Sequence, residues 1–206
     1  MNPFLDDWLE GQSPRQLTSK RRALKFLHRA YTACVSDLLN KPRTDLTSEN
    51  NVFSFHHGTP LPDLRLLTSW MLTHAPNKRA LARLIPALWK RHGREDLTVA
   101  GMLLANLENK ALGQDGWMAF IHLLQRQEPL MVVLEVAEEL VRGGRPVPND
   151  DWMEAAASQS PYWHQYCVLF LSLRKNGVSS KRLVSQAPKG GEMFERIRAR
   201  LLATED

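Results

Sequence analysis

The feature that most constrains the fold is an apolar period of helical spacing that runs along almost the whole chain. Leu24, Leu27 and Tyr31, for example, are three and four residues apart and fall on one face of an α-helix. Capping residues, glycines and prolines divide the chain into segments of roughly 8–20 residues, the usual length of globular helices. No alternation of apolar and polar residues indicates a strand. We therefore predict an all-α protein of about ten helices.

Short polar side chains predict where these helices begin, because their oxygens accept a hydrogen bond from an unpaired N–H of the first turn. Such residues precede apolar periods at Thr18 or Ser19, Asp63, Asn77, Asp96, Asp150 or Asp151, Ser160, and Ser179 or Ser180. The helix expected over 78–92 contains Pro86, which has no N–H, so we expect a kink there. Gly93 should end that helix, and the last helix should span 192–203.

The predicted helices belong to one domain over residues 1–206 with three segments. Residues 1–41 hold N-terminal helices, 42–62 form an irregular loop, and 63–206 form stacked helix pairs. From residue 63 onward the pairs are about 35–45 residues long, the length of helical repeats. This grouping predicts stacked antiparallel helix pairs in a HEAT-like α-solenoid. A compact helical bundle is the alternative.

The loop at 42–62 holds three prolines, two asparagines and a glycine, a composition that disfavours regular structure. It also carries Phe53, Phe55, His56 and His57. Long loops inside domains often carry function, which is one interpretation of these side chains. The other is that they anchor the loop to the core. The sequence leaves both open.

The net charge of +5 is concentrated in the first half of the chain. Residues 1–100 hold 15 Lys and Arg against 9 Asp and Glu, whereas residues 101–206 hold 12 against 13. Cations crowd the first turns of the helix expected after residue 19, at Lys20, Arg21, Arg22, Lys25, His28 and Arg29. Because cations at a helix N-terminus oppose the helix dipole, this placement indicates either a surface that binds a polyanion or a solvated face.

Cysteine usage and hydropathy predict a cytoplasmic protein. Cys34 and Cys167 fall within apolar helical patterns, which is typical of buried free thiols, and their spacing predicts neither a disulfide framework nor a zinc site. The N-terminal segment is acidic and lacks the apolar stretch of a signal peptide. No apolar run approaches the roughly 18 residues of a membrane span, so we expect no membrane partner.

The chain carries no motif of known catalytic or cofactor chemistry, such as a phosphate loop, a nucleophile elbow or a dinucleotide fingerprint. His56 and His57 are adjacent in an extended loop, so their side chains point in opposite directions, and no Cys or carboxylate cluster stands nearby. Glu135 and Glu138 share a helix face but have no histidine in register. We predict no metal and no cofactor, and the pattern assigns no catalytic residue.

Two segments resemble the HEAT-like-repeat DNA alkylation-repair glycosylases. Leu84–Leu104, LIPALWKRHGREDLTVAGMLL, has a helix that ends in Leu-Trp, a short charged turn, and a helix of small and apolar residues. Ser158–Leu173, SQSPYWHQYCVLFLSL, has a serine-containing turn, Trp163 two residues after Pro161, and a strongly apolar helix. The resemblance covers about residues 63–175. It implies a curved stack of helix pairs with a basic concave groove for duplex DNA.

The chain departs from this family where the catalytic carboxylate would lie. The family has a segment rich in tryptophan and aspartate at the start of the helix that here spans Pro129–Val141, but this chain reads QEPLMVVLEVAEEL. Glu135 is the nearest carboxylate and falls about one position out of register, and Tyr166 replaces an expected basic residue. The resemblance therefore implies a divergent relative without base-excision activity.

Charge and resemblance together predict a protein that binds duplex DNA without sequence specificity. The predicted DNA-binding residues are Arg79, Arg83, Lys90, Arg91, Arg94, Trp117 and Trp163. The two tryptophans lie near helix starts, where they would either stack on bases or fill junctions between helix pairs. Two further functions stay open: a scaffold that binds a protein partner, and an active alkylpurine DNA glycosylase with a displaced carboxylate.

Overall fold

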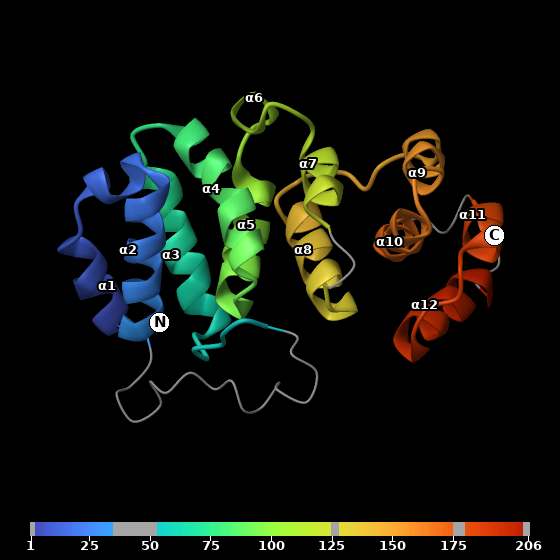
Figure 1. The fold of residues 1–206 in the computed structure, drawn as a ribbon, viewed down its shortest axis with the longest axis horizontal. Coiled ribbons are helices and arrows are strands. Elements are labelled where there is room, and N and C mark those ends of the chain that lie inside the picture. Colours follow the sequence, from blue (N-terminus) through green and yellow to red (C-terminus); the bar gives the residue numbers. More distant parts are fainter. Residues whose placement is uncertain (1–2, 35–52, 125–127, 175–179, 204–206) are drawn as a thin grey trace. The chain divides into compact units, whose positions relative to one another are not determined.

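The computed structural model describes residues 3–34, 53–124, 128–174 and 180–203, which form helices joined by turns and contain no β-strand (Figure 1). The prediction of an all-α protein is confirmed. In these same ranges, no helix has both the length and the hydropathy needed to cross a membrane. Most of the predicted 42–62 loop lies outside the described residues.

Backbone contacts divide the chain into two compact units, unit 1 from Met1 to Leu123 and unit 2 from Leu124 to Asp206. Unit 1 contains α1 (Pro3–Glu10), the 3-10 helix η1 (Pro14–Thr18), α2 (Lys20–Ala33), α3 (Leu61–His74), α4 (Lys78–Arg91), α5 (Arg94–Asn106), α6 (Asn109–Leu112) and α7 (Gly116–Leu123). Unit 2 contains α8 (Leu130–Arg142), α9 (Asp150–Ala157), α10 (Pro161–Leu171), α11 (Lys181–Gln186) and α12 (Glu192–Ala203). We describe each unit by itself, and the single domain over 1–206 stays a prediction.

The helices of unit 1 contact their second neighbours along the chain. α1 packs on α3, α3 on α5 and α5 on α7, while α2 packs on α4 and α4 on α6. Further contacts join α1 to α2, α4 to α5 and α6 to α7. Odd- and even-numbered helices therefore form two series, and Figure 1 shows α3 and α5 side by side within unit 1.

The core of unit 1 lies around α5. Every residue of α5 from Glu95 to Ala105 is buried, as expected for a helix surrounded by others. α4 packs against it with the apolar side chains of Leu81, Leu84, Ile85, Leu88 and Trp89. The ring of Trp89 meets the ring of Phe120 edge-on, with 5.8 Å between the ring centroids. This core holds the ends of α4 and α5 in fixed positions.

Unit 2 is organised around α10, which contacts α8, α9, α11 and α12. The residues of α10 from Tyr166 to Leu171 are all buried, including Cys167. Cys167 is therefore the buried thiol that the sequence predicts, whereas Cys34 in unit 1 is only half-buried.

Four of the predicted caps are confirmed. Ser19, Asn77, Ser160 and Ser180 each accept a hydrogen bond from a backbone N–H in the first turn of the following helix. α12 also begins and ends at the residues predicted for the last helix. Each of these four residues directly precedes the helix that it caps.

The aspartate caps at Asp63 and Asp96 are wrong. α3 begins at Leu61 and α5 at Arg94, so each aspartate occupies the third helical position. Both side chains are buried, and a buried side chain in the first turn belongs to the packing of the core. It follows that the irregular loop predicted over 42–62 ends at Pro60, the N-cap residue of α3.

Two further helix ends differ from prediction. In α9 the cap is Asn149, which accepts from the N–H of Trp152, so the predicted caps Asp150 and Asp151 lie inside the first turn. α4 ends at Arg91, and His92 adopts the left-handed conformation there with φ 55°. Gly93 does not end α4 but serves as the N-cap residue of α5.

Candidate functional site

A basic groove lies where η1, α2 and α4 meet in unit 1. Its volume is about 760 Å³, and it is lined by Gln16, Arg22, Leu24, Lys25, His28, Arg29 and Arg91. This volume falls in the range of natural ligand sites. Among the described residues, those that line the groove include no Asp or Glu. Its chemistry is therefore that of an anion-binding site.

The sequence of α2 explains why one wall is cationic. From Gly11 to Cys34 the chain has six Lys and Arg and no Asp or Glu. The apolar face of α2 packs inward through Ala23, Phe26, Leu27, Ala30 and Tyr31. Helical periodicity then directs the remaining residues, including Arg22, Lys25, His28 and Arg29, toward solvent. The charge of this wall follows directly from an amphipathic helix with basic polar positions.

Arg91, the last residue of α4, supplies the opposite wall and is held from three sides. Its Nε lies 2.7 Å from Oδ2 of Asp96 in an ion pair, and its Nη1 donates to the carbonyl oxygen of Leu24 at 3.4 Å. Its guanidinium carbon lies 5.2 Å from the centroid of the Phe55 ring, a cation–π distance. These contacts join α4 to α2, to α5 and to the segment after residue 52.

Asp96 links Arg91 to the core. The hydroxyl of Tyr31 donates to Oδ1 of Asp96 at 3.0 Å, and the Asp96 side chain is 0% exposed. Burial raises the pKa of Asp96 to about 7, although the positive charge of Arg91 and the Tyr31 hydrogen bond both act to lower it. Burial and the Asp96 carboxylate together hold the pKa of the Tyr31 hydroxyl well above its usual value. The proton of Asp96 therefore changes near neutral pH.

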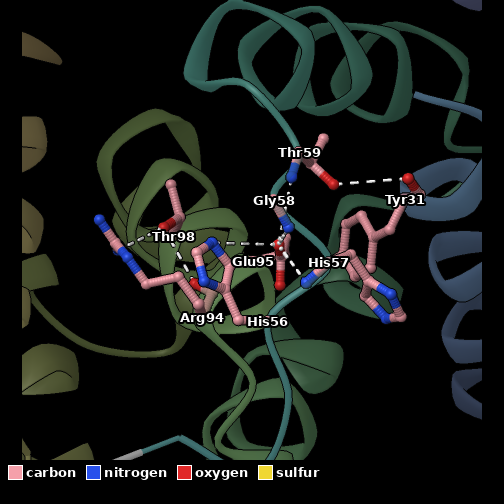
Figure 2. A network of polar contacts seen from close by, with 8 residues as sticks. All are labelled: Tyr31, His56, His57, Gly58, Thr59, Arg94, Glu95 and Thr98. Atoms are coloured by element: carbon pink, nitrogen blue, oxygen red, sulfur yellow. Dashed lines mark hydrogen bonds and ion pairs between the residues drawn. The ribbon is translucent and has the colours of Figure 1, made fainter. Parts of the chain in front are cut away.

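Glu95 holds the segment from His57 to Thr59 onto α5. Its Oε1 accepts hydrogen bonds from the backbone N–H groups of His57, Gly58 and Thr59 at 2.8, 2.9 and 3.3 Å. Figure 2 shows these three N–H groups turned toward the carboxylate, with His56 beside it. Glu95 is 1% exposed, so the segment would lose its only buried charged acceptor among the described residues if Glu95 were removed.

Phe55 fixes the same segment against the junction between α4 and α5. Ser54 N–H donates to the carbonyl of His92 at 2.9 Å, and Arg94 N–H donates to the carbonyl of Phe55 at 3.0 Å. A Cβ atom on Gly93 would lie 2.0 Å from Cζ of Phe55, so only glycine fits there without movement of the ring. For residues 53–59 these contacts support the anchor interpretation; residues 42–52 of the loop lie outside the described residues.

His57 connects the anchored segment to the groove. Its ring lies 5.4 Å from that of His28, which lines the groove, and 6.0 Å from that of Tyr31, measured between ring centroids. Burial lowers the pKa of His57, and the nearby Glu95 carboxylate opposes that shift. The neutral form of His57 is therefore favoured in this position.

The structure brings only one of the predicted DNA-binding cations into the groove. Arg91 lines it. Arg79, Arg83 and Lys90 are exposed and lie four and seven residues apart, so they form a stripe along α4. Arg94 is half-buried, and its Nη1 donates to Oγ1 of Thr98 at 3.0 Å.

The predicted tryptophans do not gather at this groove. Trp117 is 2% exposed in the core of unit 1, so its ring is not accessible for stacking on a base, and that role is corrected. Trp163 is half-buried at the start of α10 in unit 2. The core-filling alternative fits Trp117 because its ring packs where the helices of unit 1 meet.

Sequence reasoning missed Tyr31, Glu95 and Asp96 as members of a site. The only signal in the sequence is the pair of adjacent acids, Glu95 and Asp96, directly after Gly93 and Arg94. Acids in a first turn are common, but these two are buried, which acids rarely are. Within the described ranges, no group of three or more His, Cys, Asp or Glu residues is placed to hold a metal ion. No protein-family model, no curated protein and no solved structure matches the chain.

Proposed function

We propose that this protein binds duplex DNA without sequence specificity, through the basic groove of unit 1. The observation that carries the proposal is the groove itself, where cations of α2 face Arg91 of α4 and no carboxylate lines the described walls. Such a surface attracts the phosphate backbone and releases the counterions that surround it. The Lys and Arg side chains that line the groove can contact phosphate oxygens, and such contacts carry no sequence information.

We also propose that unit 1 is a short HEAT-like stack of helix pairs. The support is the contact pattern of second neighbours, α1 with α3, α3 with α5, α5 with α7, and likewise α2 with α4 and α4 with α6. Stacked helical hairpins produce two such series, because each pair contacts only the pairs before and after it. The groove then lies on the surface of the even-numbered series.

The glycosylase alternative has no support at this groove. A glycosylase needs a carboxylate that reaches the sugar of the lesion, since the developing positive charge lies there. Asp96 is the carboxylate nearest to Arg91 in the network, and its side chain is 0% exposed behind the guanidinium. We therefore propose binding without base excision at this site.

The experiment is a salt titration of binding to a fluorescently labelled 20-bp duplex of random sequence. For wild-type protein we expect log Kd to rise linearly with log salt, with about 0.9 added to the slope by each phosphate contact. The triple variant Arg22→Gln, Lys25→Gln, Arg29→Gln should lower the slope by about 2–3 and weaken binding at least about tenfold at low salt.

The matched control is the triple variant Arg79→Gln, Arg83→Gln, Lys90→Gln, which removes the same charge from the exposed stripe of α4. We expect it to bind nearly as wild type. If the two triple variants exchange these results, the DNA surface is the α4 stripe predicted from the sequence and the groove proposal is wrong. Absence of duplex binding by wild-type protein at low salt sinks the proposed function and favours a protein partner.

A further inference from the structure

Arg91 is held by more contacts than the other cations of the groove, of which Arg29 donates to Oε1 of Gln16. In the described part of the chain, no hydrogen bond or ion pair fixes the side chains of Arg22 and Lys25. Arg91 has its Nε on Asp96, its Nη1 on the Leu24 carbonyl and its plane beside the Phe55 ring. A guanidinium fixed in this way loses little freedom when it binds, whereas mobile lysine and arginine side chains lose much more.

The contacts of Arg91 also leave one edge of the guanidinium available. No hydrogen bond or ion pair of Arg91 within the described residues uses Nη2, and the side chain is 28% exposed on the groove wall. In a guanidinium group, two N–H groups on neighbouring nitrogens match the spacing of two phosphate oxygens, so one arginine can donate to both. The hydrogen bond from Nη1 of Arg91 to the Leu24 carbonyl is long. A phosphate oxygen is therefore able to replace that carbonyl as the acceptor.

We infer that Arg91 is the residue that recognises phosphate directionally in this groove, and that Asp96 is its positioning residue. The inference rests on the proposed function, because the ligand class is the phosphodiester group of DNA. The α2 cations supply long-range attraction, while Arg91 fixes where one phosphate sits. Asp96 acts only through Arg91, since its side chain is 0% exposed and has Tyr31 on its other oxygen.

Asp96 also sets the charge that a phosphate meets. With Asp96 ionised, the Arg91–Asp96 pair is neutral as a whole; with Asp96 protonated, it carries one positive charge. Because the pKa of Asp96 is raised to about 7, a fall in pH through neutrality should strengthen phosphate binding. The charged and titratable groups near Asp96 are Arg91 of α4, Tyr31 of α2, its neighbour Glu95, and His57 of the anchored segment.

The first test compares Arg91→Lys with Arg83→Lys, a change in the exposed stripe of α4, on the same labelled duplex. Both keep the charge, so the salt slope should stay as in wild type. Arg91→Lys should weaken binding about tenfold, because lysine lacks the planar fork and cannot hold Asp96 in the same way. Arg83→Lys should bind within about twofold of wild type, because Arg83 is exposed, does not line the groove and keeps its charge. Equal affinities for the two variants overturn the inference.

The second test is the pH profile of wild type against Asp96→Asn between pH 5.5 and 8.5, a range of roughly 1.5 units on either side of neutrality. Asparagine has the shape of aspartate without its charge: its oxygen can face Nε of Arg91, and its amide N–H can then donate to the Tyr31 hydroxyl oxygen, which reverses the direction of that hydrogen bond. We expect Asp96→Asn to bind more tightly than wild type at pH 8.5 and equally at pH 5.5. His28 is present in both proteins, so the difference isolates Asp96.

The outcomes separate the inference from the proposed function. Parallel pH profiles for wild type and Asp96→Asn overturn the part of the inference in which the protonation of Asp96 sets the charge at Arg91, even if Arg91→Lys fails to fold. If wild-type protein binds with a strong salt slope while Arg91→Lys binds as wild type, only the inference fails. If wild-type protein does not bind duplex at any salt, the proposed function itself fails. Circular dichroism of each variant checks that it is folded at the assay temperature.

Discussion

The first turns of α9 and α12 in unit 2 carry the opposite charge to the first turn of α2 in unit 1. In unit 2, α9 begins with Asp150 and Asp151, and α12 has Glu192 and Glu195 in its first turn. These carboxylates lie at the positive end of the helix dipole, where they stabilise the helix. In unit 1, α2 begins with three cations, Lys20 to Arg22, at the same end of the dipole. α9 and α12 follow the electrostatic rule for helices, and α2 violates it at the wall of the groove.

Buried charge shows the same contrast. Unit 1 buries the three carboxylates Asp63, Glu95 and Asp96, while in unit 2 the described residues bury one, Glu128, and the centre is built from the apolar residues of α10. Unit 1 has 16 Lys and Arg against 11 Asp and Glu, whereas unit 2 has 11 of each. Departures from local rules gather at functional sites because binding, not stability, selects the residues there. This comparison supports the proposal that the binding surface lies in unit 1.

The largest expected effect is on unit 2. Phe170→Ala deletes a fully buried ring of α10 and should destabilise unit 2 by about 3–5 kcal/mol. Hydrogen exchange followed by mass spectrometry should show faster exchange in peptides of α8 to α12, with peptides of α2 to α5 unchanged. DNA binding should persist, because every residue that lines the groove belongs to unit 1.

Phe170→Leu is the milder companion, which keeps most of the volume and should cost less than about 1.5 kcal/mol. If Phe170→Ala accelerates exchange equally in peptides of α2 to α5, the two units unfold together. The two units would then not be independent in stability, and the contrast drawn between them would not hold for unfolding.

The next largest effect concerns the anchored segment of unit 1. Gly93→Ala places a Cβ atom 2.0 Å from Cζ of Phe55, so the ring must leave its position beside Arg91. We expect the free energy of unfolding of unit 1 to fall by about 1–3 kcal/mol. The amide hydrogens of His57 and Thr59, which donate to Glu95, should exchange faster. Hydrogen exchange measured by NMR resolves these amides singly.

Gly191→Ala in unit 2 is the matched control. A Cβ atom at Gly191 meets nothing within 4 Å, so we expect the stability to change by less than about 0.5 kcal/mol. If both alanine variants behave alike, then Phe55 does not depend on Gly93 for its position, and the anchor is weaker than its contacts indicate.

The sequence predicted those parts of the fold that depend on neighbours in the chain. Ser19, Asn77 and Ser180 were recognised as caps because each precedes an apolar period and bonds to an N–H two or three residues away. The all-α class followed for the same reason, since helical hydrogen bonds and helical apolar faces are both local. The cationic face of α2 could also be predicted, because its cations stand at the helix N-terminus, where they oppose the helix dipole.

The network behind the groove could not be predicted in this way, because its partners are far apart in the chain. Glu95 bonds to residues 36 to 38 positions earlier, and Tyr31 bonds to Asp96 across 65 positions. An aspartate before an apolar helix resembles a cap, so Asp96 was misread at a position where burial gives it another role. Likewise, among the described residues, Arg91 is the one cation of α4 that lines the groove because α4 ends beside α2 at that residue, and the sequence alone does not show this contact.

The smallest expected effect on stability is the sharpest test of the contrast in first turns. Arg22→Glu puts a carboxylate three residues after Ser19, which creates the serine–glutamate capping box and a favourable charge for the dipole. We expect the free energy of unfolding of unit 1 to rise by about 0.5–1 kcal/mol. Because Arg22 lines the groove, binding to the labelled duplex should nevertheless weaken by at least about tenfold at low salt.

Asp151→Arg in α9 makes the opposite change in unit 2. It replaces an exposed first-turn carboxylate with a cation, so unit 2 should lose about 0.5–1 kcal/mol, while duplex binding should stay within about twofold of wild type. Opposite signs of stability and binding for Arg22→Glu, with stability alone affected by Asp151→Arg, mean that the charge of α2 is retained for binding. If Arg22→Glu stabilises unit 1 and leaves binding unchanged, the cations of α2 form only a solvated face, and the contrast between the units carries no functional meaning.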